Sequence, residues 1–502
     1  MQYLNMEKIC LLVLLLVIVV ATTSINRLHP LSVNATTSID KSSDIEMFSA
    51  HDATGFFLYQ SDTGLGCLEA TEQELATMVA TQNLAETYLK QDLHQINHLE
   101  ATTENGVKII LRGTQQLENF PQAKAAFLKA AATWEALIDD PVTLTMDVDF
   151  GPTLFGVGRF PTNVIGATIA RSLVYDYATV RAGLLANASN EQETSLYNLL
   201  PDTEVPTDIK GRSTTEIPVI TATSAIYRTI GIFNSTSELA DATIGFNSNF
   251  SFDLDPIDGI NSDSIDFDAV AVHEIGHALG FTSRTGLRDA LPTQPLSLTT
   301  WDLFRFRPDV TLATFTQQPR VLSTGGKPVF FAGGPRLQLS TGSTLRGGDG
   351  RQTSHWKDDL LMPEKQRQKI GIMDPTIARG ERNTITENDL MALDAFGYRL
   401  KRPDFSLSLE SAMVSVKRGE KGKFTVKIDR NSGFTGNVVV SAPDTKADKI
   451  KLSPAKQSTT DNSVSFDFAI KKSAVIGSQQ LIFSGRDDVG RLTTITLTLT
   501  IQ

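Results

Sequence analysis

The chain has 502 residues, which predicts two or three folded domains at the usual size of about 100–200 residues each. Its composition, with 41% apolar and 21% charged residues, is that of a globular protein and excludes collagen-like, coiled-coil and wholly disordered chains. Acidic residues outnumber basic ones by 57 to 46, for a net charge of −11, and no Lys/Arg-rich block occurs, so we expect no nucleic-acid partner. The two cysteines, Cys10 and Cys67, exclude a disulfide framework and a multi-cysteine metal cluster.

The N-terminus has the pattern of a signal peptide. Lys8 precedes the apolar run from Ile9 to Ala21, which is shorter than the ~20 residues that span a bilayer. Small residues follow up to Ser24 and suit a cleavage site. We expect residues 1–24 to be removed and the mature chain to be secreted, or to lie at the cell surface, without an integral membrane span. A permanent anchor is the alternative.

Residues 25–105 are polar and predict a pro-region or an N-terminal accessory segment. Within them, Glu72–Leu99 contains good helix formers without Gly or Pro and predicts a helix. His94 and His98 would share one face of it and could bind a metal, but no acidic residue completes a motif with them. A solvated helix face is the better interpretation.

Residues 106–402 mix helical and strand patterns and predict an α+β domain. Residues 107–113 and 142–150 are typical of strands, and residues 121–138 predict a helix with Pro121 in its tolerant first turn. Residues 403–502 instead contain short alternating runs separated by turn residues, which predict an all-β, immunoglobulin-like sandwich. This second region has no His or Cys, so we expect no catalysis there.

The segment 266–281, DFDAVAVHEIGHALGF, carries the sharpest chemical signal. His273 and His277 are four residues apart, so on a helix both imidazoles lie on one face and can bind one Zn²⁺. Glu274 lies between them, where it can activate a zinc-bound water instead of ligating the metal. Asp266 or Asp268 can cap this helix and Gly280 can end it.

A catalytic zinc site needs a third protein ligand and an open position. The residue six positions after His277 is Ser283, a poor ligand, and no Glu occurs between Glu274 and Glu364. His355 is the one histidine after His277 and is our predicted third ligand, with Asp289 in reserve. Residues 284–350 contain Gly-rich stretches and are expected to loop out between the two parts of the site.

Met373, in QKIGIMDPTIARGE, resembles the methionine turn of metzincins, in which a thioether packs beneath the zinc-binding histidines; Met362 is the competing candidate. An ordinary core methionine is the alternative. Thr386 to Asp389 then forms a capping box for a helix that runs to Phe396 and ends at Gly397.

The order HEIGHALGF, SHW, IGIMDPTIARGE and ITENDLMALDAFGY resembles bacterial secreted zinc metalloproteases of the metzincin-like, leishmanolysin-related type. The resemblance covers roughly residues 106–400. It implies a metzincin-like zinc protease domain, with His273, His277 and His355 as ligands, Glu274 as general base and Met373 in the Met-turn. The chain departs from the best-known members in having almost no cysteines, so their disulfides are not carried over.

These features predict a secreted zinc-dependent endopeptidase acting on a protein or peptide substrate. Glu274 would take a proton from the zinc-bound water and deliver it to the leaving amine. The substrate would lie extended beside an edge strand. The alternatives are a surface adhesion or binding protein with a structural or vestigial metal site, and a zinc hydrolase acting on a non-peptide substrate.

Two further features stay open. Cys67 lies upstream of the predicted catalytic domain, and its thiolate could fill the open zinc position and keep the enzyme latent; an ordinary free thiol is the alternative. The acidic segment 252–268 could bind Ca²⁺, although its spacing misses the EF-hand register and a solvated loop is the simpler interpretation. Its carboxylates are Asp253, Asp255, Asp258, Asp263, Asp266 and Asp268.

Overall fold

The computed structural model describes part of the N-terminal region and most of the chain after residue 105. The described residues are 53–61, 64–69, 93–96 and 106–502, with gaps at 157, 162, 235–238, 291–294, 365–366, 402, 432–433, 444, 446–448 and 489. The predicted signal peptide, Cys10 and His98 lie outside them. The chain divides into two compact units, Met1–Glu46 and Met47–Gln502, and every described residue belongs to the second unit.

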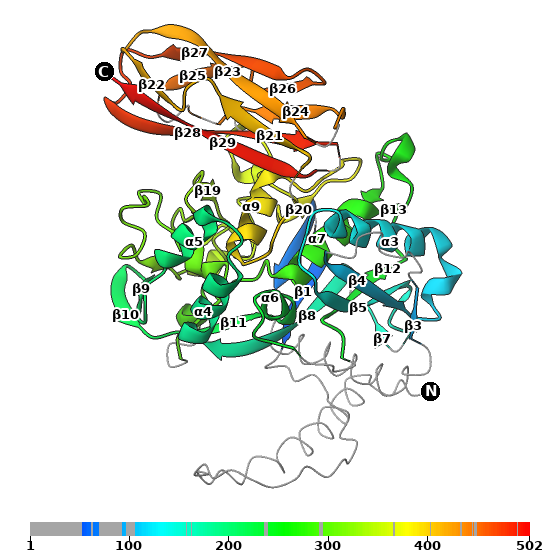
Figure 1. The fold of residues 1–502 in the computed structure, drawn as a ribbon. Coiled ribbons are helices and arrows are strands. Elements are labelled where there is room, and N and C mark those ends of the chain that lie inside the picture. The colour runs from blue at the N-terminus through cyan, green and yellow to red at the C-terminus, as the bar shows by residue number, and fades with distance from the viewer. Residues whose placement is uncertain are drawn as a thin grey trace, which may run out of the picture. The chain divides into compact units, whose positions relative to one another are not determined.

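A large mixed sheet organises the first part of this unit (Figure 1). Its strands are ordered β20-β2-β1-β8-β12-β5-β4-β3. The strands β4 (Lys108–Gly113), β5 (Thr143–Gly151) and β12 (Ala242–Asn247) run parallel, and β8 (Val164–Asp176) is antiparallel to β12. The strands predicted at 107–113 and 142–150 are therefore confirmed.

The N-terminal hairpin formed by β1 (Ala53–Ser61) and β2 (Gly64–Glu69) extends this sheet. Strand β1, blue in Figure 1, pairs antiparallel with β8, so β8 is not an edge strand in this form of the chain. On its other side β2 pairs with the short strand β20 (Thr376–Ile377). A segment that precedes the predicted catalytic domain thus bridges two elements of that domain.

Helices α3 (Pro121–Glu135) and α7 (Phe267–Leu279) pack against each other over the sheet. The indole N–H of Trp134 on α3 donates to the Val272 carbonyl of α7 at 3.0 Å. The predicted helix at 121–138 is confirmed, although it ends three residues earlier. Because Phe127, Phe246 and Phe267 pack together in the common hydrophobic core, the two helices are held rigidly on the sheet.

The remaining elements of this part are short. The helices are α4 (Tyr177–Asn187), α5 (Glu191–Asn198), α6 (Ser224–Thr229), α8 (Leu287–Ala290) and α9 (Glu387–Ala395). The strands are β6 (Thr153–Leu154), β7 (Gly158–Arg159), β9 (Val205–Ile209), β10 (Arg212–Glu216), β11 (Val219–Thr223), β13 (Phe252–Asp253), β14 (Ile265–Asp266), β15 (Ser297–Leu298), β16 (Arg305–Phe306), β17 (Arg320–Val321), β18 (Val329–Phe330) and β19 (Leu337–Gln338). The predicted insertion at 284–350 is thus mostly loops and two-residue strands.

The predicted helix over Glu72–Leu99 is wrong in its described part. His94 and Gln95 form strand β3, which pairs antiparallel with Gly113 and Arg112 of β4. Pairing with an open sheet edge outweighs the local helix propensity, which is a weak prior. The His94 ring contacts the Glu118 carboxylate at 2.6 Å.

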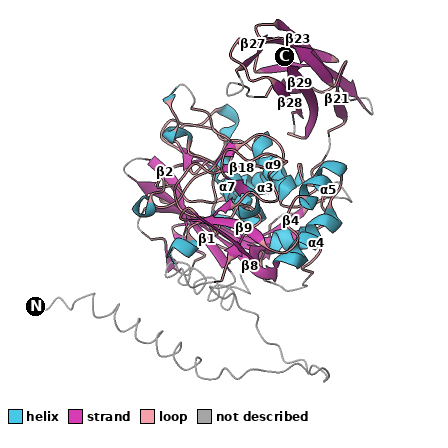
Figure 2. Cartoon of the chain, turned by 90° about the vertical axis from the view of Figure 1, so that its left-hand side faces the viewer, coloured by secondary structure: helices cyan, strands magenta, loops and turns pink. Residues whose placement is uncertain are grey.

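In its described residues, the C-terminal part contains strands without helices (Figure 2). It has its own hydrophobic core. One sheet has the order β21-β23-β27-β25 and the other β22-β29-β28-β24-β26, so the predicted two-sheet sandwich is confirmed. The strands are β21 (Phe405–Leu409), β22 (Met413–Val416), β23 (Lys421–Arg430), β24 (Val438–Ser441), β25 (Ile450–Ser453), β26 (Lys456–Thr459), β27 (Ser463–Ile470), β28 (Gly477–Asp487) and β29 (Leu492–Ile501).

Among the described residues, the helices are all too short or too polar to cross a bilayer.

Candidate metal centre

Helix α7 presents two of the predicted ligands. The Asp266 side chain accepts a hydrogen bond from the Ala269 N–H and caps the helix start, and Gly280, at a φ of 127°, ends the helix. Only a residue without Cβ adopts this backbone conformation easily. Between these ends, His273 and His277 project from one face and are 1% and 0% exposed. The local sequence therefore predicts both the helix and the direction of its imidazoles.

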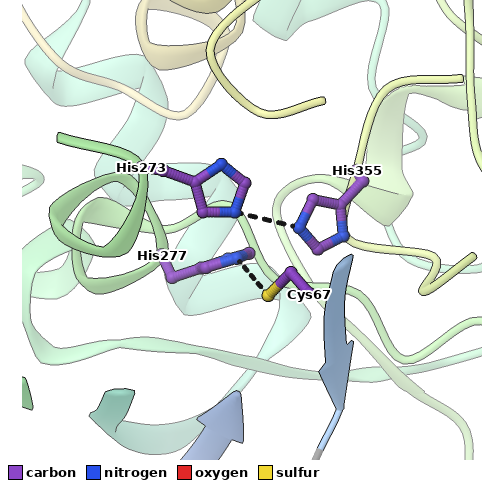
Figure 3. Close-up of side chains that lie close together, drawn as sticks. All are labelled: Cys67, His273, His277 and His355. Carbon is purple, nitrogen blue, oxygen red and sulfur yellow. Dashed lines mark hydrogen bonds between the residues drawn. The ribbon is translucent and has the colours of Figure 1, made fainter. Parts of the chain in front are cut away.

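Two distant segments complete a four-residue cluster, shown in Figure 3. His355 brings its Nε2 to 3.2 Å from Nε2 of His273, and Cys67 brings its Sγ to 3.5 Å from Nε2 of His277. One ligand atom from each of the four residues lies within 4.8 Å of the others. All four side chains are buried. The structure thus brings together the side chains of His355, the predicted third ligand, and Cys67, the predicted latency thiol.

The hydrogen bonds of the imidazoles set their orientation. Nδ1 of His273 lies 2.8 Å from the Ile372 carbonyl, and Nδ1 of His277 lies 2.7 Å from the Phe281 carbonyl. Nδ1 of His355 is 3.2 Å from the Gln352 carbonyl. A carbonyl only accepts, so each Nδ1 carries the proton and each neutral ring turns an Nε2 lone pair towards the cluster.

Two of the six separations between the donor atoms suit a tetrahedral zinc ion. Zinc–nitrogen bonds of about 2.0–2.1 Å and zinc–sulfur bonds of about 2.3 Å imply tetrahedral edges of roughly 3.3 Å between two nitrogens and 3.6 Å between nitrogen and sulfur. The observed 3.2 Å between His273 and His355, and 3.5 Å between Cys67 and His277, match these edges. Two facing lone pairs at 3.2 Å repel each other, and a cation between them removes that cost.

Burial keeps the imidazoles neutral. It lowers the pKa of His273 to about 4, and it lowers the pKa values of His277 and His355 well below the usual range. For His277 the neighbouring His273 and His355 rings act in the same direction. A neutral imidazole is the form that binds a metal, so the site needs no deprotonation of these rings near neutral pH.

Glu274 is the unusual group of the site. It is 0% exposed, and within the described part of the chain neither carboxylate oxygen has a partner with hydrogen-bond geometry. Burial raises the pKa of Glu274 to about 7, and the nearby hydroxyl of Thr168 on β8 opposes this rise. A buried carboxyl without partners is costly for stability and therefore indicates a functional role.

Met373 lies directly under α7. A Cβ at Gly276, between the two helical histidines, would come within 2.6 Å of the Met373 sulfur. Met373 is 0% exposed and the peptide N–H of Trp356 donates to its carbonyl at 3.0 Å. Its thioether therefore supports the helix at the level of the predicted ligands, whereas Met362 ends a 3-10 turn, Asp359–Leu361, and is partly exposed.

The N-terminal hairpin covers this cluster. The Phe56 ring of β1 stacks on the His277 ring, with 3.8 Å between centroids and 8° between planes. On β2, the peptide N–H of Cys67 donates to the Pro375 carbonyl at 2.9 Å, two residues after Met373. No local sequence pattern predicted the role of Phe56, because that role depends on strand pairing between distant segments.

Other predicted residues lie elsewhere. The Asp289 carboxylate accepts hydrogen bonds from the N–H and the hydroxyl of Thr324 and does not belong to the histidine cluster. In the acidic loop, Asp253 accepts from Asn261 and from the Asp255 N–H, and the loop's described carboxylates form no group of three. A calcium site in this loop therefore lacks support.

A second group of possible ligands is formed by Asp358, Asp359 and Asp374. Asp358 accepts hydrogen bonds from Arg351 and Thr376, and Asp374 accepts from the N–H of Thr376. These bonds already compensate much of the negative charge of the carboxylates. The three residues therefore have a structural explanation.

Comparisons with known proteins do not assign the chain to a family. No protein-family model and no curated protein matches it. Solved structures match about a fifth of the chain. A Caenorhabditis elegans MSP family member, WR4, has a TM-score of 0.17 at 6% identity and covers 19% of this chain and 97% of its own. The BIgI domain of beta protein from S. agalactiae, solved bound to CEACAM1, has a TM-score of 0.15 at 23% identity and covers 20% and 96%.

Proposed function

We propose that the chain is a secreted zinc-dependent endopeptidase of the metzincin-like type, held latent by its own N-terminal segment. The single observation that carries this proposal is the convergence of three inward-facing Nε2 atoms, together with a buried carboxyl on the same helix that has no partner of good hydrogen-bond geometry among the described residues. Those atoms belong to His273, His277 and His355, and the carboxyl belongs to Glu274. Three imidazoles with an adjacent general base are the set that zinc hydrolases use.

The chain's own groups divide the chemistry between them. When bound, zinc would polarise the scissile carbonyl and acidify the attacking water. The carboxylate of Glu274 accepts the proton of that water and then donates it to the leaving amine nitrogen. Burial raises the pKa of this carboxyl to about 7 in the metal-free site, and a bound dication would lower it. Met373 and the carbonyl partners of the imidazoles keep the ligands in place.

Latency follows from the position of Cys67. With three imidazoles and one thiolate the zinc would have four protein ligands, which leaves no position for water or substrate. The thiolate also comes from the N-terminal hairpin, which precedes the predicted catalytic domain. We therefore assign Cys67 the role of a removable fourth ligand and residues 25–105 the role of a pro-region.

The hairpin also occupies the path expected for substrate. Strand β1 pairs antiparallel with β8 from Ala53 to Tyr59, and Thr168, opposite Phe56 in this register, lies near Glu274. Displacing the hairpin opens the β8 edge, to which an extended peptide could add as a strand. The proposed substrate is therefore an extended segment of a protein or peptide.

The rival function is a surface adhesion or binding protein in which a closed Cys-His metal site is purely structural. A fourth protein ligand agrees with this alternative as well. It does not explain Glu274, because a structural site needs no buried carboxyl beside its ligands and loses stability by keeping one without partners. A structural role also predicts that removal of the hairpin unfolds the site instead of activating it.

The test compares the intact chain with a chain cut at an engineered protease site within residues 70–92, both loaded with zinc, on casein. We expect the cut chain to cleave casein and phenanthroline to abolish this cleavage. The Glu274→Gln variant, cut in the same way, controls for contaminating protease. Zinc-loaded, folded cut chain that cleaves neither casein nor gelatin would contradict the proposed function.

A further inference from the structure

Asp389 lies at the centre of a hydrogen-bond network that reaches the metal centre from behind. It is the third residue of α9 and is 0% exposed. Its Oδ2 accepts the N–H of Thr386 at 2.7 Å and the N–H of Ile372 at 2.8 Å. Its Oδ1 accepts the indole N–H of Trp356 at 2.8 Å. Only the bond to Thr386 serves the helix cap; the other two tie α9 to the segments that carry the site.

One branch of the network leads to His273. The peptide group between Ile372 and Met373 has its carbonyl against Nδ1 of His273 at 2.8 Å. The N–H of the same peptide group, on Met373, points to Oδ1 of Asp389 at 3.4 Å. A carboxylate on the N–H side polarises a peptide group and makes its carbonyl a better acceptor. The carboxylate thus fixes the protonated nitrogen of His273 and increases the basicity of its Nε2.

The other branch leads to His355. Trp356 follows this histidine directly in the chain, is 0% exposed and donates its indole N–H to Asp389. Its peptide N–H donates to the Met373 carbonyl, so the residue is held at two points. With Trp356 anchored, the His355 backbone has little freedom to move relative to the turn at Met373.

We propose that Asp389 is a positioning residue that holds His273 and His355 in ligating orientation. This inference rests on the proposed zinc site. It assigns Asp389 a role beyond the helix cap that its sequence position predicts. The tight fit agrees with this role, since a Cβ at Gly371 would collide with the carboxylate, so the turn closes directly on Asp389.

The test measures zinc affinity and the absorption spectrum of the cobalt-substituted full chain for Asp389→Asn. The amide keeps the shape, but it removes the charge and turns one acceptor into a donor that faces N–H groups. Removing such a group behind a ligand lowers metal affinity by roughly 10–100-fold. We expect a loss of this size and a shifted cobalt d–d spectrum, because both imidazoles reorient.

Asp241→Asn is the matched control. Asp241 is also buried, at 2% exposed, and accepts from Ser224, Arg228 and the Thr145 N–H, with no recorded bond to the metal centre. We expect it to lower stability while zinc affinity and the cobalt spectrum stay as in the wild type. Equal zinc affinity in wild type and Asp389→Asn, with an unchanged spectrum, would overturn the inference.

If Asp389→Asn does not fold, Trp356→Phe tests the second branch, because it removes the indole N–H; it also shrinks a buried ring, so its stability is measured alongside. It should change the cobalt spectrum and weaken zinc binding; wild-type values for both would again overturn the inference. These readouts do not depend on proteolysis. A wild-type chain that binds zinc but cleaves no protein would contradict the proposed function. The comparison of zinc affinity and cobalt spectra between wild type and variants would remain valid.

Discussion

Helix α7 and the N-terminal hairpin reach the same cluster of donor atoms, but they are attached to the protein in different ways. Helix α7 is capped by its own residues, buried on the sheet and bonded to α3 through Trp134. The hairpin is held by strand pairing with β8 and β20 and by the stacked ring of Phe56. Under the proposed function, the imidazoles of α7 are permanent ligands and the thiol of the hairpin is a removable one.

The largest expected effect concerns α7. Glu274→Gln should lower proteolysis by the cut, zinc-loaded chain by roughly 10²–10⁴-fold, because general-base assistance is lost. Initial rates on a quenched fluorescent peptide measure this change. Zinc content, measured on the same samples, should stay at the wild-type level, since Glu274 is not a ligand. Full activity of Glu274→Gln would show that α7 supplies ligands but no base.

His355→Ala tests whether the permanent ligand set extends beyond α7. In a Cys67→Ala background, we expect His355→Ala to lose most of the about one zinc per chain, because only two imidazoles remain and they bind zinc much more weakly. Asp289→Ala serves as the control and should retain its zinc, since that carboxylate binds Thr324. Metal analysis after dialysis against a weak chelator measures both. Zinc loss in Asp289→Ala with zinc retained in His355→Ala would reassign the third ligand.

Cys67→Ala tests whether the thiol of the hairpin inhibits the enzyme. In the intact chain we expect a partial gain of activity, because the fourth ligand is gone while β1 still covers the β8 edge. Cutting within residues 70–92 should add to that gain by raising the fraction of chains with an open site. Cys67→Ser provides a matched variant of nearly equal size. The hairpin would have no inhibitory role if neither cutting nor substitution changed the rate.

The smallest effect concerns packing under α7. Gly276→Ala places a Cβ within 2.6 Å of the Met373 sulfur and should lower the free energy of unfolding by about 1–3 kcal/mol. The cost should shrink in a Met373→Ala background, because that variant removes the clash. Urea unfolding of the two single variants and the double variant measures this coupling. Additive effects would mean that the thioether does not support the helix.

Local patterns predicted much of the fold. The caps of α7 and α9, Asp266 and Thr386, lie next to the residues they cap, so their signals are present in short windows of sequence. The alternating runs after residue 404 predicted the sandwich for the same reason. His94 shows the limit of this approach, because pairing with β4 converted an expected helix into a strand.

The sequence alone predicted only part of the site. The spacing of His273 and His277 determines their geometry, and the scarcity of histidine pointed to His355. The proximity of Cys67 depends on β1 pairing with β8, more than 100 residues away, and no local pattern encodes that contact. The sequence predicted Asp389 as part of a helix cap. Its hydrogen bond with Trp356 could not be predicted from a local pattern, because the two residues are 33 positions apart.

Zinc X-ray absorption on the intact chain tests the central claim most directly. The account predicts one sulfur at about 2.3 Å and three nitrogens at about 2.0–2.1 Å, with the sulfur replaced by a lighter atom once the hairpin has been cut away. A spectrum without sulfur in the intact chain, or with sulfur still bound in active, cut protein, would contradict it.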